Sequence, residues 1–175
     1  MKPLLAAVAL CITVAVAPAV AKTPGEVGVG EPLREAWMQG LNGPPRKLSE
    51  YRGKPLIINV WASWCGPCRQ EMASLERLAW RDEARAFRVI GISTDDHPQA
   101  ASAFLKRSNA TFSHFIDSRL QMENMLGASQ IPLTVLVDAQ GRVLEKVVGA
   151  KEWDSAEALR FIAAAFRTGA RTGTR

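Results

Sequence analysis

A continuous apolar segment, residues 55–61, followed directly by a helical pattern, constrains the fold of this chain more than any other feature. A strand that is apolar at every position, rather than at alternate positions, is typical of a strand buried on both faces. The pattern that follows places Met72, Leu75 and Leu78 on one side of a helix. We therefore predict that the chain folds as an α/β domain.

The rest of the chain repeats this alternation. Strands are predicted over residues 86–94, 113–117, 132–138 and 142–148, and helices from residue 98, over 119–126 and over 155–167. Asn42-Gly43 is a hairpin signal between residues 33–41 and 46–48. A chain of 175 residues can bury one core. We predict one domain, residues 33–167, whose mainly parallel sheet has an antiparallel edge formed by its last two strands.

Residues 1–21 have the composition of a secretory signal peptide. Lys2 precedes the apolar residues 4–16, and the small residues of Ala19-Val20-Ala21 form a cleavage pattern. We expect cleavage after Ala21, which would also remove Cys11. The alternative is an uncleaved membrane anchor, but this apolar run is 13 residues long, whereas a spanning helix needs about 20.

The segments that flank the predicted domain show no apolar periodicity. Residues 22–32 are rich in Gly and Pro, and residues 168–175 are mostly polar. Segments of this kind at the ends of a domain are poorly ordered unless they are tied down. We therefore predict a flexible lead over 22–32 and a disordered tail over 168–175.

The charge of the chain is basic without indicating a nucleic-acid partner. The formal net charge is +5, and it becomes +4 once Lys2 is removed with the signal. Arginines recur at near-helical spacing at positions 77, 81, 85 and 88, which can mark a nucleic-acid footprint. Acidic residues interrupt that run, and an exported protein rarely meets nucleic acid. We expect no nucleic-acid partner.

The chemistry is concentrated in Trp64-Cys65-Gly66-Pro67-Cys68, which follows the first buried strand and begins the first helix. Unpaired N–H groups and the helix dipole stabilise an anion at this position, so we expect Cys65 to have a lowered pKa and to react as a thiolate. Cys68 lies one helical turn further, within reach of the sulfur of Cys65. The pattern predicts that Cys65 attacks a substrate disulfide and Cys68 resolves the mixed disulfide, with no cofactor beyond this redox-active pair.

Other uses of the two cysteines fit the sequence less well. A structural disulfide that closes so short a loop contributes about 2 kcal/mol in the chain-entropy account, against ~3 kcal/mol for a fifteen-residue loop. A zinc site needs four ligands, and His97 and His114 are 17 positions apart, which is not the spacing of a zinc finger. We expect two surface histidines and no metal site. An alternative of another class is a Cu(I)-handling or partner-binding module in which the cysteines are ligands.

The segment Asn59-Val-Trp-Ala-Ser-Trp-Cys-Gly-Pro-Cys-Arg-Gln-Glu71 resembles the active-site segment of exported thioredoxin-fold oxidoreductases of the TlpA, ResA and CcmG group. Similar segments follow the same order along the chain: Tyr51-Arg52-Gly53-Lys54, Ile92-Ser93-Thr94-Asp95 and Ile131-Pro132-Leu133-Thr134-Val135-Leu136-Val137-Asp138. The resemblance implies thiol–disulfide oxidoreductase activity and a thioredoxin-like fold, with a central mixed sheet flanked by helices. The predicted N-terminal hairpin is an addition to that fold.

The resemblance also implies how a substrate binds. It implies that Pro132 is cis and faces the cysteine pair, and that the backbone of Ile131 pairs with an extended substrate segment. Trp64, Gly66 and Pro67 would then contact the substrate beside the reactive sulfur. The alternative for Trp64 is an ordinary core tryptophan.

Glu71 lies three residues after Cys68, on the same face of the predicted helix. The resemblance implies an acidic residue here that assists proton transfer to or from the buried thiol, a role that needs a pKa raised by burial. The alternative is a solvated carboxylate on the helix surface. Asn59 occupies the position of a buried aspartate in cytosolic thioredoxins, so we expect Glu71 to substitute for that acid.

These features predict a periplasmic thiol–disulfide oxidoreductase that reduces disulfides in exported proteins. An oxidising compartment would leave the pair oxidised, so the resemblance implies a membrane thiol relay of the DsbD or CcdA type as electron donor. A second hypothesis within the same fold is a dedicated apocytochrome c reductase in cytochrome c-type biogenesis. Its client would carry a Cys-x-x-Cys-His segment.

Overall fold

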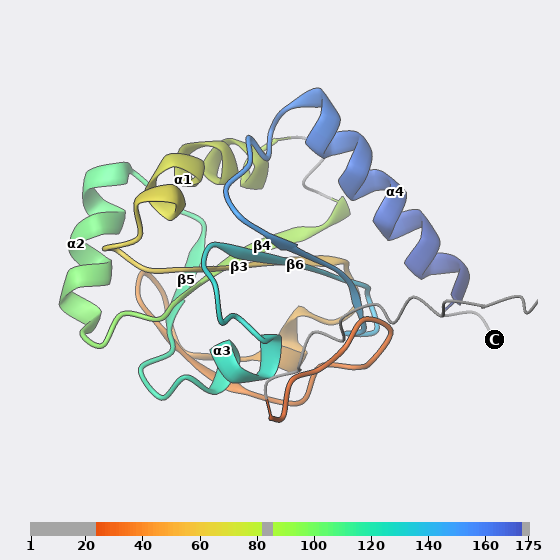
Figure 1. Ribbon diagram of the computed structural model, residues 1–175, viewed down its shortest axis with the longest axis horizontal. Helices are drawn as coiled ribbons and strands as arrows, with labels where there is room; N and C mark the ends of the chain where they lie inside the picture. The colour runs from red at the N-terminus through yellow and green to blue at the C-terminus, as the bar shows by residue number, and fades with distance from the viewer. Residues whose placement is uncertain (1–23, 82–85, 173–175) are drawn as a thin grey trace, which may run out of the picture.

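The computed structural model describes residues 24–81 and 86–172, which form a mixed α/β domain (Figure 1). The strands are β1 (Trp37–Gly40), β2 (Arg46–Lys47), β3 (Leu56–Trp61), β4 (Arg88–Ser93), β5 (Ser113–Ile116), β6 (Leu133–Val137) and β7 (Val143–Val148). The helices are η1 (Leu48–Tyr51), α1 (Gly66–Ala79), α2 (Pro98–Ser108), α3 (Gln121–Leu126) and α4 (Ala156–Thr172). Each predicted strand and helix is present.

The strands of the described residues form one sheet in the order β2-β1-β5-β4-β3-β6-β7. Strand β4 pairs in parallel with β3 and β5, while β6 is antiparallel to β3 and β7 is antiparallel to β6. The predicted antiparallel edge is therefore present. The prediction of a mainly parallel sheet is wrong, because the N-terminal hairpin adds antiparallel strands at the other edge through the pairing of β1 with β5.

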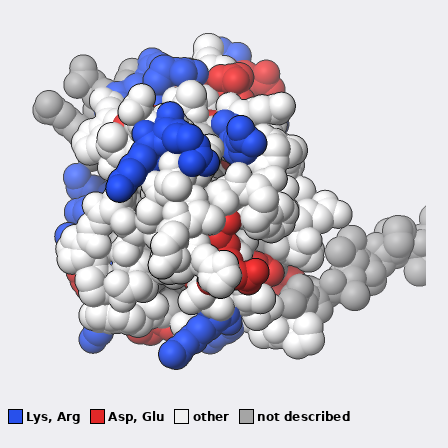
Figure 2. Space-filling model, turned by 90° about the vertical axis from the view of Figure 1, so that its left-hand side faces the viewer, with Lys and Arg blue, Asp and Glu red and all other residues white. Residues whose placement is uncertain are grey.

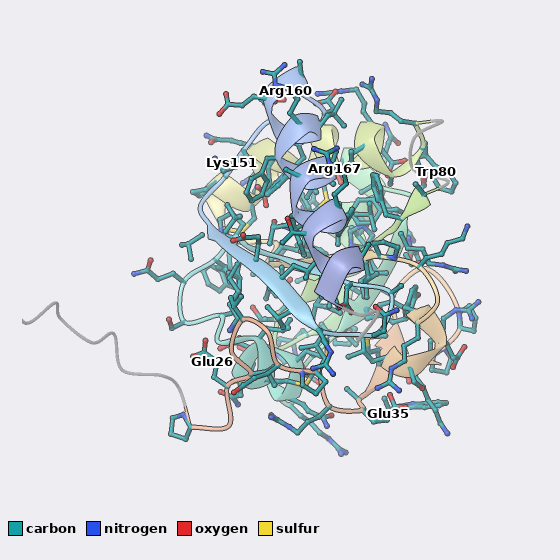
Figure 3. The ribbon with its side chains drawn as sticks, turned by 90° about the vertical axis from the view of Figure 1, so that its right-hand side faces the viewer. Glu26, Glu35, Trp80, Lys151, Arg160 and Arg167 are labelled. Carbon is teal, nitrogen blue, oxygen red and sulfur yellow. A yellow bond between two sulfur atoms is a disulfide. The ribbon has the colours of Figure 1, made fainter. Side chains whose placement is uncertain are left out.

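Helices cover both faces of the sheet, which explains the unbroken apolar pattern of β3, where all six side chains are buried. Side chains of α1, α2 and α4, including Leu75, Phe104 and Ile162, share one apolar cluster with alternate residues of β3. The other cluster contains α3 and η1. Figure 1 shows α1 and α4 on one side of the sheet and α3 on the other. Figure 3, viewed from the right-hand side of Figure 1, shows α4 in front of the sheet, with Arg160 and Arg167 labelled on it.

The N-terminal hairpin has the predicted strands, joined by the Asn-Gly-Pro-Pro segment. Strands β1 and β2 pair Trp37 with Lys47 and Met38 with Arg46. A Cβ atom on Gly40 would collide with the backbone of Gly43, so the close return of the chain requires glycine at this position.

The segment predicted to be a flexible lead, residues 22–32, is instead packed on the domain over its described part. Val27 is buried, and its N–H donates to the carbonyl oxygen of Met125 at 2.9 Å. The N–H groups of Gly30 and Leu33 donate to the carbonyl oxygens of Val143 and Gly141, both at 2.8 Å. These are backbone hydrogen bonds, which do not depend on side-chain type. The prediction of flexibility from Gly and Pro content was therefore wrong.

The predicted disordered tail, 168–175, is also wrong over most of its length, because α4 continues to Thr172. Gly169 is buried, and a Cβ atom there would press on the side chain of Leu144, so this turn of the helix packs closely on β7. The signal peptide predicted over 1–21 lies outside the described residues. Among the described helices, none has the length and apolar character needed to cross a membrane.

Candidate active site

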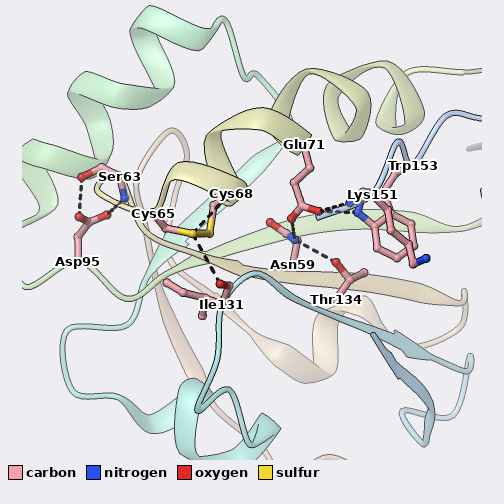
Figure 4. Close-up of a disulfide and its surroundings, with 10 residues drawn as sticks. All are labelled: Asn59, Ser63, Cys65, Cys68, Glu71, Asp95, Ile131, Thr134, Lys151 and Trp153. Atoms are coloured by element: carbon pink, nitrogen blue, oxygen red, sulfur yellow. Dashed lines mark hydrogen bonds between the residues drawn. A yellow bond between two sulfur atoms is a disulfide. The ribbon is translucent and has the colours of Figure 1, made fainter. Parts of the chain in front are cut away.

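The cysteine pair lies where β3 leads into α1. A turn of four residues follows Trp61 and is closed by the N–H of Cys65, which donates to the carbonyl oxygen of Ala62 at 3.1 Å. Cys65 is the N-cap of α1, and its sulfur accepts a hydrogen bond from the N–H of Cys68 at 3.2 Å. The two sulfurs form a disulfide (Figure 4). The predicted position of Cys65 at a helix start is confirmed, and an anion there is stabilised by the helix N-terminus.

The two sulfurs differ in their access to solvent. Cys68 is fully buried, while Cys65 is 6% exposed and lies between exposed residues, Trp64 and Gly66. Pro67 is exposed as well. Trp64 is 70% exposed, so the alternative of a core tryptophan is wrong for this residue. A foreign disulfide that approaches this surface meets Cys65 first.

The loop before β6 faces the reactive sulfur. The Ile131–Pro132 peptide bond is cis, as the resemblance implied. The carbonyl oxygen of Ile131 lies 3.8 Å from the sulfur of Cys65. Ile131 is half-buried and Pro132 is buried, so the backbone at this site is held in place by packing while its carbonyl points to the disulfide (Figure 4).

Glu71 is buried, with 2% of its surface exposed, so the alternative of a solvated helix carboxylate is wrong. Its carboxylate accepts hydrogen bonds from the amide of Asn59 at 2.7 Å, the indole N–H of Trp153 at 2.9 Å and the backbone N–H of Lys151 at 3.2 Å. Asn59 also donates to the hydroxyl of Thr134 at 3.0 Å. Burial raises the pKa of Glu71, and the three hydrogen bonds oppose that shift without cancelling it. The raised pKa is the property that a proton-transfer role needs.

Asp95, a residue without a predicted role, holds the turn before Cys65. One carboxylate oxygen accepts the backbone N–H of Ser63 at 2.9 Å, and the other accepts the Ser63 hydroxyl at 2.6 Å. Ser93 donates its hydroxyl to the same carboxylate at 2.7 Å. Asp95 follows β4 and is 3% exposed. The only feature of the sequence that could have indicated this role of Asp95 is the position of an acidic residue just after a predicted buried strand.

The face of the molecule on the side of α2 combines charged and uncharged areas. Figure 2 views the molecule from the side on which α2 lies in Figure 1, and it shows a broad uncharged surface interrupted by basic and by acidic side chains.

The family model described as Redoxin matches residues 28–161, well over half of the chain. This chain belongs to the Redoxin family. The match spans the cysteine pair, the Asp95 and Glu71 networks and the cis-proline loop.

The chain is similar to proteins whose names refer to thiol–disulfide exchange. Thiol-disulfide oxidoreductase ResA of Geobacillus thermodenitrificans (strain NG80-2) is 29% identical over 123 residues, which cover 70% of this chain and 71% of the relative. A crystal structure assigned as thiol:disulfide interchange protein DsbE from Chlorobium tepidum is 29% identical with a TM-score of 0.72, covering 80% of this chain and 99% of that chain. A proposed protein disulfide isomerase from Bacteroides thetaiotaomicron, solved in solution, is 26% identical with a TM-score of 0.71, covering 85% and 96%.

These likenesses confirm the predicted thioredoxin-like fold and the resemblance to the ResA group. The Redoxin therefore belongs with the thiol–disulfide oxidoreductases of the ResA and DsbE type, and it has their Cys-x-x-Cys pair as a disulfide. Such a pair can exchange two electrons with another disulfide, because each step replaces one S–S bond by another.

One sequence prediction about this Redoxin's histidines is wrong. His97 is exposed as expected, but His114 on β5 is buried. Burial lowers the pKa of His114 to about 3, which keeps the imidazole neutral. Both of its nitrogens lack hydrogen-bond partners among the described residues. Those residues contain no group of three or more His, Cys, Asp and Glu side chains arranged to hold a metal ion.

Proposed function

We propose that this Redoxin is a periplasmic thiol–disulfide oxidoreductase that reduces disulfides in exported proteins. The observation that carries the proposal is the asymmetry of the pair: Cys65 caps a helix beside an exposed surface, while Cys68 is fully buried one turn further. An attacking sulfur must be reachable and easily ionised, whereas a resolving sulfur needs only to reach its neighbour. The geometry fits these two roles.

The reaction begins with the reduced pair. The Cys65 thiolate attacks one sulfur of the substrate disulfide, so that an S–S bond forms between Cys65 and the substrate while the substrate's own S–S bond breaks and its second sulfur leaves as a thiolate. Cys68 then loses its proton and attacks Cys65. The bond between Cys65 and the first substrate sulfur breaks and that sulfur leaves as a thiolate, so the substrate has gained two electrons and the enzyme holds the Cys65–Cys68 disulfide seen in the structure.

Glu71 is proposed to take the proton from Cys68 in the second step. Its carboxylate is buried on the same helix, one turn after Cys68, and burial raises its pKa towards the range in which a carboxylate accepts protons near neutral pH. Trp153 and Asn59 hold the carboxylate through hydrogen bonds of 2.9 and 2.7 Å, which orients it without neutralising it.

The substrate is proposed to bind as an extended segment beside the cis peptide bond. The carbonyl of Ile131 is available for strand-like backbone pairing close to the Cys65 sulfur. Trp64, Gly66 and Pro67 are the exposed residues next to Cys65 in the chain. A disulfide held by this surface and by the Ile131 backbone has one of its sulfurs directed at Cys65.

The location and the electron donor follow from the same proposal. The signal-peptide pattern of residues 1–21 supports export. A dithiol that works as a reductant in an oxidising compartment must be re-reduced after each cycle, so we propose a membrane thiol relay of the DsbD or CcdA type as donor.

A Cys68→Ser variant tests the proposal because it stops the reaction at the mixed disulfide. Expressed in a cell that exports it, the variant is expected to accumulate disulfide-linked complexes that dithiothreitol releases and mass spectrometry identifies. Cys65→Ser is the matched control and traps nothing. Absence of trapped proteins with an exported, folded variant contradicts the proposal.

The identity of the trapped proteins decides between a general and a dedicated role. Clients with Cys-x-x-Cys-His segments support the narrower hypothesis of an apocytochrome c reductase. Unrelated exported proteins contradict that specialisation and support the general role. An anaerobic Cu(I) titration tests the copper hypothesis, which is contradicted if binding is weak and unchanged by Cys65→Ala.

A further inference from the structure

The turn between β3 and α1 determines where the reactive sulfur and its exposed neighbour lie. Ser63 and Trp64 occupy the two central positions of this turn, between the carbonyl of Ala62 and the N–H of Cys65. The indole of Trp64 is 70% exposed, so no packing of the ring in the core fixes its position. Of the two central residues, Ser63 is therefore the one whose side chain can hold the conformation of the turn.

Both carboxylate oxygens of Asp95 accept hydrogen bonds from Ser63. One oxygen accepts the backbone N–H at 2.9 Å and the other accepts the side-chain hydroxyl at 2.6 Å (Figure 4). Two hydrogen bonds to one residue restrict its rotation as well as its position. Hydrogen bonds to an ionised acceptor are also about twice as strong as those between neutral groups.

Asp95 is itself fixed by the end of β4. The hydroxyl of Ser93 donates to the Asp95 carboxylate at 2.7 Å and accepts the backbone N–H of Asp95 at 3.2 Å. The N–H of Thr94 donates to the carbonyl oxygen of Trp61 at 2.9 Å, which joins the ends of β4 and β3. The active-site turn is thus fastened to a rigid strand end.

A buried carboxylate is costly unless hydrogen bonds compensate for its lost hydration. Asp95 is 3% exposed, and three hydrogen bonds, two from Ser63 and one from the Ser93 hydroxyl, present donors to its carboxylate oxygens. A neutral side chain of similar size would avoid that cost, but an amide offers one acceptor oxygen where the turn presents two donors. Only a carboxylate of this size supplies both acceptor oxygens that the two donors of Ser63 require.

We propose that Asp95 is a positioning residue: acting through Ser63, it fixes Trp64 and Cys65 relative to the Ile131 carbonyl, so that an extended peptide disulfide meets both sides of the site at once. The inference rests on the proposed exchange at Cys65. Asp95 does not touch the sulfur, so its effect is on docking and alignment rather than on the reactivity of the thiolate. A small disulfide that reaches only the sulfur is insensitive to Asp95.

The experiment compares two disulfides on the purified, reduced protein. One is a peptide with an internal disulfide, and the other is hydroxyethyl disulfide, which is too small to contact Trp64 and Ile131 together. Asp95→Asn is expected to lower kcat/KM for the peptide about tenfold, because misplacement of a positioned group by about 1 Å can cost about a hundredfold in rate. The same variant is expected to change the rate with hydroxyethyl disulfide less than about twofold.

Ser93→Ala is the matched control, because it removes a hydrogen bond from the same buried carboxylate and leaves both bonds to Ser63 in place. Because Ser93 also helps to fix Asp95, this variant is expected to lower the peptide rate less than Asp95→Asn does and to keep the rate with hydroxyethyl disulfide within about twofold of the wild type. Ser63→Ala keeps Asp95 and the backbone bond, so it tests the same link in a protein whose buried carboxylate is unchanged; about a threefold loss with the peptide alone is expected. The double variant, Ser63→Ala with Asp95→Asn, should be no slower than Asp95→Asn.

If the wild-type protein reduces both disulfides, three outcomes overturn the positioning role of Asp95. These are equal losses for both disulfides in Asp95→Asn, an equal loss of peptide activity in Ser93→Ala, and additive losses in the double variant. Wild-type protein that reduces neither disulfide contradicts the proposed function itself, and with it the role of Asp95.

Discussion

Two buried titratable groups lie at opposite ends of one row of paired residues across the sheet: His114 belongs to the row, and Glu71 of α1 is hydrogen-bonded to Asn59 at its other end. Asn59 of β3 pairs with Gly91 of β4, and Gly91 pairs with His114 of β5. At the Asn59 end, Glu71 receives three hydrogen bonds. At the other end, both nitrogens of His114 lack hydrogen-bond partners among the described residues, and a Cβ atom on Gly91 would collide with the imidazole.

The difference shows how burial acts on an acid with partners and on a base without them. Burial raises the pKa of Glu71 above its ordinary value of 4.5, and lowers the pKa of His114 from 6.5 to about 3. Glu71 therefore contributes stability that is fully present below pH 4.5 and is lost as pH rises through its folded pKa. His114 has the opposite sign: stability falls as pH drops from 6.5 towards 3, because the unfolded chain takes up the proton first.

The largest effect is expected from His114→Leu, which replaces the imidazole by an apolar group of similar volume. Wild-type protein should lose on the order of 3 kcal/mol between pH 8 and pH 4 through His114 alone, and the variant should not. Urea unfolding at the two pH values measures the difference, with His97→Leu as the exposed control. Parallel losses in wild type and His114→Leu would contradict the assigned role of burial.

The second-largest effect is expected from Glu71→Gln. The rate of disulfide exchange at pH 7 should fall about a hundredfold, because an amide cannot accept the proton of Cys68. Stopped-flow release of the substrate thiol measures the rate. Glu76→Gln is the matched control on the same helix, since Glu76 accepts hydrogen bonds from Thr111 outside the site. If Glu71→Gln keeps the wild-type rate, the carboxylate is only structural.

Trp153→Phe should have a smaller effect, because it removes one of the three hydrogen bonds to the Glu71 carboxylate. That bond lowers the pKa of Glu71, so its loss raises the pKa further and moves the pH profile of exchange upward by up to about one unit. Stability should fall by about 1 kcal/mol. A profile that moves downward would show that Trp153 acts in another way.

The smallest effect is expected from Arg77→Ala. Arg77 pairs with Asp154 at 2.6 Å on the same segment that carries Trp153, but its side chain is exposed. Exposed ion pairs contribute little to stability, so thermal unfolding and the pH profile should stay close to wild type. A shifted pH profile would mean that the surface pair, rather than the buried bonds, orients Glu71.

The sequence predicted those features that depend on neighbours along the chain. Strand β3 is observed within one residue of the predicted 55–61, because burial on both faces makes its apolar pattern complete. Cys65 was placed at a helix start by the same local pattern, and the burial of Glu71 was one of two stated alternatives. The cis bond at Pro132 was implied by the resemblance alone, since an X–Pro sequence favours trans.

The missed features depend on contacts between distant segments. Asp95 holds a residue 32 positions away, and neither segment shows that link by itself. His114 was predicted to lie on the surface because its side chain is polar, which the sequence shows directly. Its burial depends on its pairing with Gly91 and on the Phe112 ring, whose centroid lies 4.0 Å from that of the imidazole. The described part of the lead is held by backbone hydrogen bonds, which leave no pattern in side-chain type.

The packing of that lead has a consequence for the free edge of the sheet. Strand β7 ends the strand order, and unpaired edge strands are where copies of a protein stack and aggregate. Here the N–H and C=O of Val143 are already taken by Glu31 and Gly30. Self-association through the start of β7 is thereby blocked.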